Sequence, residues 1–197
     1  MEINYIVENA SGILTNTQIT WQSIFKSEDK ISEIYTNYLL PILLLPVIGK
    51  FIGFTLVGYS LPHTNSMIRT PFMDGLKELV LSYGIIIIFI YVLALLMKHI
   101  IRKFEINIEL NQSFKLVAFS TTPVCLAGIL FVFPGFSQLV IFGAAYAIYI
   151  LYQGVIEIVD EAGNKALTIT VVASGVVIIF WIGLEIVLNE FVRSFPV

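Results

Sequence analysis

Long runs of apolar residues, separated by short polar stretches, dominate the sequence. The runs cover residues 37–58, 79–97, 116–133, 139–159 and 167–188. Each is roughly 20 residues long, and a helix of that length, rising about 1.5 Å per residue, spans a hydrocarbon core about 30 Å thick. The pattern therefore predicts an all-α fold: a polytopic membrane helical bundle with five transmembrane helices.

The third and fourth runs are separated only by residues 134–137, Pro-Gly-Phe-Ser. So short a connection predicts an antiparallel hairpin. Proline cannot continue a helix, and glycine tolerates the positive φ that reverses a chain. We expect Pro134 to end one span, Gly135 to turn the chain with a positive φ, and Ser137 to cap the next helix.

The third run contains a polar step, Ser120-Thr121-Thr122-Pro123. Proline frees a backbone carbonyl one turn earlier, and in lipid a neighbouring hydroxyl can satisfy that carbonyl. We therefore expect a kink at Pro123, repaired by hydroxyls of the same helix. The alternative is that these hydroxyls line a polar route across the membrane.

Residues 1–36 form an amphipathic N-terminal segment whose apolar residues recur at helical spacing opposite charged ones. Trp21 and Phe25 lie on the apolar face, and tryptophan prefers the membrane–water boundary. The segment is expected to lie at the interface, or alternatively to pack against other parts of the protein. Ser27 is expected to cap a new helix that continues into the first span.

The first span carries two prolines, Pro41 and Pro46, which predict a bent helix. It also contains Gly49 and Gly53, a spacing that lets another helix approach closely. Between the second and third spans, residues 104–110 alternate between apolar and polar residues, which indicates a strand-like or extended loop segment.

Composition agrees with a membrane protein, since 57% of the 197 residues are hydrophobic and 13% are charged. The net charge is -3, and the sequence has no run of basic residues of the kind that binds nucleic acid. We therefore expect no nucleic-acid partner. The single cysteine, Cys125, cannot form an intramolecular disulfide.

Basic residues give the orientation, because cytoplasmic loops retain Lys and Arg. With a cytoplasmic N-terminus, the inner segments hold seven of the eleven: Lys26, Lys30, Lys98, Arg102, Lys103, Lys115 and Lys165. Five spans then place the C-terminus outside. The expected organisation is a cytoplasmic segment 1–36, a membrane domain 37–190 and a short external tail 191–197.

The predicted spans carry no catalytic or cofactor motif. Ser174 is flanked by Ala173 and Gly175, as in some intramembrane serine proteases, but His63 and His99 fall in predicted loops on opposite sides. The sequence has no HExxH, paired cysteines, phosphate loop or GxGxxG. We therefore expect no catalytic residue, no metal site and no cofactor.

The remaining polar groups at depth are Lys50, Glu157, Glu185 and the polar step. A charge near the bilayer centre costs about 2.5 to 3.5 kcal/mol on insertion scales, so such residues usually mark a partner or a pathway. Lys50 and Glu185 both fall in the outer half, which predicts an ion pair between them. Alternatively, Lys50 snorkels to the interface and Glu157 is a simple boundary residue.

Several short patterns together resemble one family. They are Trp21 with Ile24, the prolines and glycines of residues 38–53, residues 115–123, Phe133-Pro134, Tyr146, Gly154 and Asn164-Lys165-Ala166. The chain resembles the small bacterial branch of the Yip-one (Ypt-interacting protein) domain family. That resemblance implies five spans and a cytoplasmic N-terminus. Eukaryotic relatives act in vesicle traffic through Rab-type GTPases, but their extended N-terminal regions are not found here, so GTPase binding is not carried over.

The function expected from the sequence is a nonenzymatic scaffold or adaptor in the bacterial inner membrane. Its expected partners are the lipid bilayer and other membrane proteins or further copies of itself. The alternative is a small channel or transporter for an ion, a small solute or a lipid, for which the kinked spans and buried polar residues are the supporting features.

Overall fold

The computed structural model describes residues 3–60, 67–159 and 163–194, and for residues 60 and 184–194 it describes the backbone alone. The described part of the chain is almost entirely helical. Its elements are α1 (Ile3–Thr15), α2 (Thr17–Lys26), α3 (Ile31–Ile34), η1 (Tyr35–Leu39), α4 (Leu40–Phe51), η2 (Ile52–Val57), β1 (Tyr59–Ser60), β2 (Met67–Ile68), α5 (Phe72–Arg102), α6 (Leu110–Ser120), α7 (Thr122–Ala127), η3 (Gly128–Val132), η4 (Pro134–Leu139), α8 (Val140–Val159) and α9 (Asn164–Ser194).

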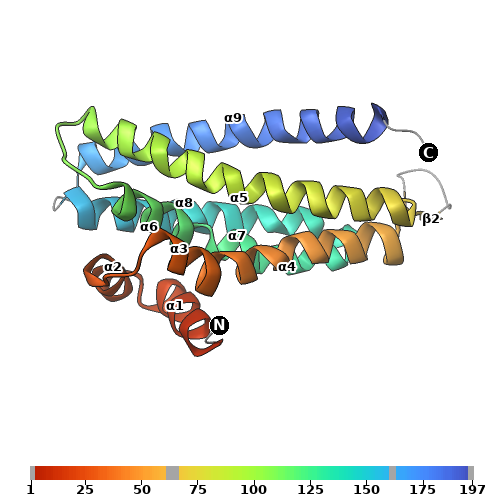
Figure 1. Cartoon of the computed structure of the whole chain (residues 1–197), viewed down its shortest axis with the longest axis horizontal. Helices are drawn as coiled ribbons and strands as arrows, with labels where there is room; N and C mark the ends of the chain where they lie inside the picture. Colours follow the sequence, from red (N-terminus) through yellow and green to blue (C-terminus); the bar gives the residue numbers. More distant parts are fainter. Residues whose placement is uncertain (1–2, 61–66, 160–162, 195–197) are drawn as a thin grey trace.

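Five helical segments are long and apolar enough to cross a membrane, which confirms the predicted fold class. They are Ile31–Val57, Phe72–Arg102, Leu110–Val132, Pro134–Val159 and Asn164–Gly183. Figure 1 shows them running along the long axis of the molecule, with α1 and α2 set against one end of the bundle. This is an integral membrane protein with five spans and an amphipathic N-terminal segment.

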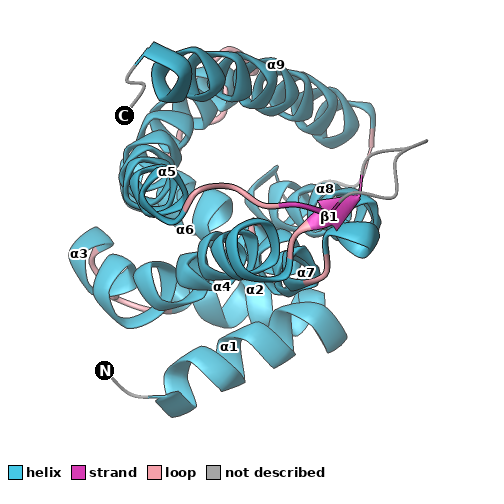
Figure 2. Ribbon diagram, turned by 90° about the vertical axis from the view of Figure 1, so that its right-hand side faces the viewer, coloured by secondary structure: helices cyan, strands magenta, loops and turns pink. Residues whose placement is uncertain are grey.

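The two ends of the bundle differ in the segments that they gather. The connection from α5 to α6 and the start of α9 lie at the same end as α2 (Figure 1). The antiparallel pair of β1 and β2 lies at the opposite end, towards which α9 also runs, and Figure 2 looks onto this end with β1 in magenta. Because the spans alternate in direction, this grouping places the predicted inner segments together.

The third span is the most enclosed of the five. In its apolar window 56% of the residues are buried inside the protein, against 22% in the second span. Eight consecutive residues of α6, from Ser113 to Ser120, are buried. A helix that is covered on all sides is expected at the centre of a bundle, because no face of it needs to match lipid or water.

The first and third spans approach closely at glycines, as the spacing of Gly49 and Gly53 predicted. A Cβ added to Gly49 would lie 2.7 Å from the carbonyl oxygen of Gly128, and one added to Gly53 would overlap the carbonyl of Phe131. Facing them, a Cβ on Gly128 would lie 2.8 Å from the Cα of Pro46. No side chain larger than hydrogen fits between these two backbones.

The hairpin between the third and fourth spans turns differently from the prediction. Residues 134–139 form a 3-10 helix, and α8 begins at Val140. Gly135 does not have a positive φ. The chain instead bends at Phe133, whose backbone is extended (φ −113°, ψ 93°). The Ser137 hydroxyl donates to the Pro134 carbonyl at 2.7 Å and therefore does not cap α8.

One further local prediction is wrong, and another is decided between its two alternatives. The helix that leads into the first span begins at Ile31, with Lys30 as its N-cap, because the Glu33 carboxylate accepts the Lys30 backbone N–H at 2.8 Å. The cap is therefore supplied from inside the helix and not by Ser27. Residues 103–109 form a turn and coil, with Glu105 at a φ of 64°, so the extended-loop alternative holds there.

Candidate functional site

The polar step of the third span is satisfied mainly by its own helix. Pro123 has no N–H to donate to the carbonyl of Phe119, one turn earlier. The Thr122 hydroxyl donates to that carbonyl at 2.7 Å, and the Thr121 hydroxyl donates to the carbonyl of Ala118 at 2.8 Å. The helix is interrupted at Thr121, between α6 and α7, which is where the kink was predicted. Thr122 thus repairs the break that the proline makes, and Thr121 also uses its hydrogen within the same helix.

Tyr38 joins this repair from the first span. Its hydroxyl lies 2.5 Å from the Thr122 hydroxyl oxygen. Since the only hydroxyl hydrogen of Thr122 goes to Phe119, Tyr38 is the donor. The Tyr38 ring also packs on the Phe119 ring, with 4.3 Å between the ring centres. The sequence did not reveal this contact, because nothing in the first span singles out Tyr38 among its apolar neighbours.

Ser120 behaves differently from the two threonines. Its hydroxyl is buried and has no hydrogen-bond partner among the described residues, and the same holds for Ser174 in α9. Both serines line one apolar cavity of about 160 Å³ between the second to fifth spans. The residues that line this cavity include no histidine, so Ser174 forms no Ser-His dyad there.

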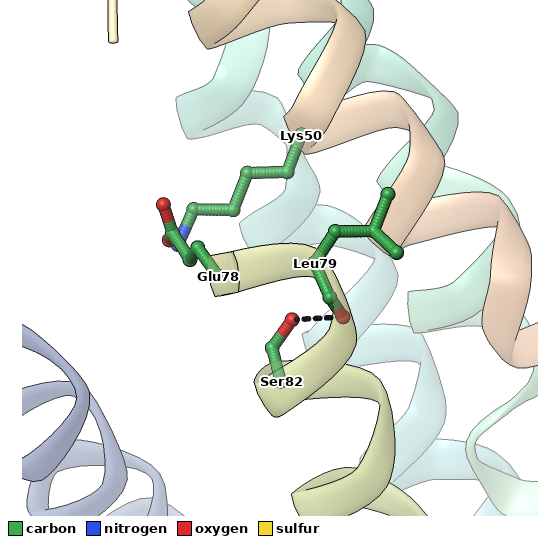
Figure 3. Close-up of polar contacts among 4 residues, drawn as sticks. All are labelled: Lys50, Glu78, Leu79 and Ser82. Atoms are coloured by element: carbon green, nitrogen blue, oxygen red, sulfur yellow. Dashed lines mark hydrogen bonds and ion pairs between the residues drawn. The ribbon is translucent and has the colours of Figure 1, made fainter. Parts of the chain in front are cut away.

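Lys50 forms an ion pair with Glu78, with 2.8 Å between its Nζ and a carboxylate oxygen (Figure 3). The side chains come from α4 and α5 and are 33% and 27% exposed. The expected partner, Glu185, has a side chain outside the described residues, so the Lys50–Glu185 pair stays a prediction. Lys50 does not simply extend its ammonium group to the membrane surface, because that group contacts the Glu78 carboxylate within the protein.

The sequence contains a signal for Glu78. The predicted second span begins at Leu79 and so excludes Glu78, whereas α5 begins at Phe72. Lys50 lies seven residues before the end of the first span at Val57, and Glu78 lies six residues after Phe72. In two consecutive antiparallel spans these positions have nearly equal depth, which would have paired them.

Glu157 lies near the end of α8, where the N-terminal segment docks. Its carboxylate accepts a long hydrogen bond, 3.5 Å, from the Gln22 side chain of α2. This contact at the end of a span agrees with a boundary position rather than a charge at the bilayer centre.

Trp21 is fully buried, although a boundary position facing lipid headgroups was one of its two expected environments. Its indole N–H donates to the carbonyl of Ile150 in α8 at 3.1 Å. Its ring stacks on Phe25, with 5.1 Å between ring centres, and lies over Gly154, where an added Cβ would be 2.8 Å from the ring. The side chain therefore has the packing environment that was the alternative expectation, while Phe25 is partly exposed.

Lys115 fixes the start of the third span to the N-terminal segment. It is 2% exposed, and its ammonium group donates to the backbone carbonyl of Ser27 at 2.6 Å and to the Ser27 hydroxyl at 3.0 Å. Next to it, the Asn111 side chain donates to the carbonyl of Asp29 at 3.0 Å. The sequence indicated Lys115 as a basic residue of the inner side and as part of the family resemblance, but not as a buried contact to Ser27.

Tyr5 holds α1 to the same region. Its hydroxyl donates to the Asp29 carboxylate at 2.9 Å. Burial, this hydrogen bond and the negative charges of Asp29 and Glu33 all raise the pKa of Tyr5. Tyr5 therefore remains a neutral donor at every physiological pH, and the N-terminal segment is held by several independent contacts.

Comparison with known proteins places the chain in a family. The model of the Yip1 domain matches residues 11–184. The inner membrane protein YohC of Escherichia coli strain K12 is 24% identical over 147 residues, which cover 73% of this chain and 75% of that protein. YohC of Escherichia coli O6:H1 gives the same values, and no solved structure matches. The chain belongs to the Yip1 domain family.

Proposed function

We propose that the protein is a nonenzymatic scaffold or adaptor of the bacterial inner membrane. The observation that carries this proposal is the polar step: its two threonine hydroxyls donate to carbonyls of their own helix, and Tyr38 donates to one of them. Hydroxyl hydrogens used in this way are not available to donate to a passing solute.

The other polar groups support the same function. Lys50 and Glu78 meet each other near one end of the bundle, and Glu157 meets Gln22 near the other. The cavity between these levels is lined mostly by apolar side chains. A conduit needs polar groups that follow one another across the membrane, whereas here the charged contacts lie at separate ends.

The proposed location is the inner membrane, with the N-terminus in the cytoplasm. The printed name of the YohC relative supports the location, and the distribution of basic residues supports the orientation. Single cysteines at Met67 and Asn107, each in a Cys125→Ser background, test it with a thiol reagent that does not cross membranes. Intact spheroplasts should label Met67→Cys and not Asn107→Cys, and the opposite result would reverse the orientation.

A flux measurement separates scaffold from conduit. We expect the purified protein in liposomes to pass neither monovalent ions nor small dyes above empty liposomes, measured beside a reconstituted channel of known conductance. The double variant Thr121→Val, Thr122→Val should unfold more easily and still show no flux. A conductance that this variant abolishes would overturn the scaffold proposal and favour a channel or transporter.

Partners are expected on the lipid-facing surface, as other membrane proteins or a second copy of this chain. Ile179 of α9 is 73% exposed and Ile169 of the same helix is fully buried, so they form a matched pair for a photo-crosslinking amino acid. Position 179 should give discrete crosslinked protein bands in the membrane and position 169 none beyond links within the chain. Crosslinking of position 179 to lipid alone would count against an adaptor.

The transporter alternative is favoured by one observation, the cavity of about 160 Å³ whose lining includes Ser120 and Ser174. A conduit would have to turn these two hydroxyls, which are covered in the structure, into the cavity. In the same liposomes, Ser120→Ala with Ser174→Ala should then reduce flux, whereas the scaffold proposal expects no flux to reduce.

A further inference from the structure

The helix α1 lies across the bundle and not along it. Figure 2, which looks along the bundle, shows α1 lengthwise while α4 and α5 are seen nearly end on. Because the spans cross the membrane, α1 is close to parallel to the membrane plane. An amphipathic helix in this orientation has the geometry of one that lies within a membrane surface.

Two contacts give the depth of α1. Near its start, the Tyr5 hydroxyl donates to Asp29, which precedes the first span. Near its end, the Leu14 carbonyl accepts a hydrogen bond of 2.6 Å from the Tyr146 hydroxyl of α8. Tyr146 precedes Gln153, at the polar end of α8, by seven residues, or about 10 Å along a helix. In-plane helices are buried about 5 to 10 Å into the boundary between headgroups and acyl chains, so α1 lies at the depth of one.

The sides of α1 differ in what they face. Ala10 and Ile13 are buried against the bundle. Tyr5, through its hydrogen bond, faces the end of the bundle that holds α2. Val7 and Leu14 lie seven residues apart and so share another side of the helix, where Val7 is 59% exposed. This last side is apolar and is not covered by the protein.

Val7 and Leu14 border an apolar groove between α1 and the first and third spans. Its volume is about 450 Å³. Side chains that line it are Ile6, Val7, Leu14, Pro41, Leu45 and Leu126. The described residues of the lining include no charged side chain, and the one hydroxyl among them, that of Ser11, donates to the Val7 carbonyl at 2.6 Å. No side chain of this lining therefore needs water as a partner.

The groove opens onto the lipid-facing surface of the bundle. One turn beyond Leu45 in the first span lies Ile48, which is 41% exposed. One turn beyond Leu126 in the third span lies Ile129, which is 48% exposed. Both spans run away from the end that holds α2, so these isoleucines continue the groove towards the middle of the bilayer. The apolar side of α1 thus faces the same acyl chains as the two spans.

We propose that an acyl chain of a phospholipid lies in this groove, with α1 above it in the plane of the membrane. The phospholipid belongs to the leaflet next to the N-terminal segment. A lining that is apolar and continuous with the lipid-facing surface matches an acyl chain, whereas bound water would need two to four polar partners. The inference does not rest on the scaffold proposal, because this lipid site requires neither a protein partner nor a flux.

Spin labels on adjacent residues of α1 test which side faces lipid. Val7→Cys and Glu8→Cys, each in a Cys125→Ser background, place one label at the groove and one on the neighbouring exposed side. The proteins are reconstituted in vesicles of phosphatidylethanolamine and phosphatidylglycerol. Electron paramagnetic resonance then measures collisions with oxygen, which concentrates in lipid, and with a nickel chelate, which stays in water. We expect the ratio of oxygen to nickel collisions to be several-fold higher at position 7 than at position 8.

The same measurement identifies the other possible occupants. Dominant nickel collisions at position 7 would show that water fills the groove. Weak collisions with both reagents there would show that a protein, such as a second copy of the chain, covers it. Either result would overturn the proposal.

Photolabelling tests the groove itself. Phosphatidylcholine with a diazirine in its acyl chain is added to the vesicles and activated by light, and labelled residues are located by mass spectrometry. Val7→Trp fills the groove with an indole ring, and Glu8→Trp adds the same side chain away from it. Labelling is normalised to Ile179 of α9, which is 73% exposed.

We expect the labelling of Leu45 and Leu126 to fall several-fold in Val7→Trp and to stay unchanged in Glu8→Trp. An absence of label on both leucines in the wild-type protein would overturn the proposal. So would labelling that Val7→Trp does not reduce, because the chain would then lie outside the groove.

Discussion

The second and third spans differ in backbone regularity and in burial. The second is one unbroken helix, α5, of 31 residues, and 22% of its apolar window is buried. The third is divided into α6, α7 and η3, and 56% of its window is buried. The smoother helix faces the lipid, and the broken one lies inside the protein.

The difference follows from where replacement hydrogen bonds are available. Lipid offers no hydrogen-bond partners, so a span that faces it must keep all its backbone hydrogen bonds within its own helix. The unbroken helix α5 does so over its whole length. The third span can contain Pro123 because Thr122 accepts a bond from Tyr38 and donates to the freed carbonyl of Phe119. Enclosure by neighbours thus permits an irregular backbone that exposure to lipid would not.

The third span also carries the attachment of the N-terminal segment. Phe119 packs edge-on against Trp21, with 6.4 Å between ring centres, and Lys115 donates to Ser27. The second span has its charged groups near its ends instead, where Glu78 meets Lys50. Substitutions in the third span should therefore disturb the whole molecule, and matched ones in α5 should not.

Glycine substitutions should give the largest contrast. Gly128 in the third span faces the backbone of Pro46, whereas an added Cβ at Gly84 in α5 would meet nothing within 4 Å. We expect Gly128→Leu to lower the free energy of unfolding by about 3 kcal/mol or more, and Gly84→Leu to change it by under about 0.5 kcal/mol. Titration with SDS in mixed micelles measures both. Equal losses would remove the claim that the third span is the tightly packed one.

Loss of the buried lysine should come next. Lys115→Met leaves the Ser27 carbonyl without its charged donor, which should cost about 2 kcal/mol. Lys98→Met near the end of α5 is the control and should be nearly neutral. The readout is hydrogen exchange of α2 and protease cleavage within the first 30 residues, both faster in Lys115→Met. If α2 stays equally protected, Lys115 does not hold the segment.

The hydroxyl repair should contribute somewhat less. Thr122→Val removes the donor to Phe119 and the acceptor for Tyr38, so we expect a loss of about 1.5 kcal/mol. Ser82→Ala in α5 removes only a 3.2 Å bond to Leu79 and should cost under about 0.5 kcal/mol. The substitution Tyr38→Phe should lower the free energy of unfolding less in the Thr122→Val background than in the wild-type protein. Strict additivity would show that the two hydroxyls do not cooperate.

The smallest effect is expected for the ion pair between the first two spans. A double-mutant cycle of Lys50→Ala and Glu78→Ala should give a coupling of at most about 1 kcal/mol, because both side chains are partly exposed. The same cycle with Glu185→Ala tests the partner that the sequence suggested. A larger coupling energy of Lys50 with Glu185 than with Glu78 would show that the main partner of Lys50 lies on α9 and not on α5.

Much of the fold could be predicted because it depends on local and periodic properties. Five apolar runs of membrane-spanning length predicted the number of membrane spans, and residues 134–137 left room only for a hairpin. The proline in the third span predicted both the interruption near Thr121 and its repair by adjacent hydroxyls, since the freed carbonyl lies one turn away in the same helix. Gly49 and Gly53 predicted a close approach, but not which helix would make it.

The remaining features depend on which segments meet in space, and no local pattern specifies that. Ser27 was predicted to cap a helix and instead accepts from Lys115, 88 residues later. Trp21 had two possible environments, and burial against Ile150 decided between them. Lys50 needed a partner of equal depth, but only the antiparallel packing of α4 on α5 brought Glu78 to it. The sequence determined which groups need partners in a membrane, because burial without them is costly, and the tertiary structure decided which residues supply them.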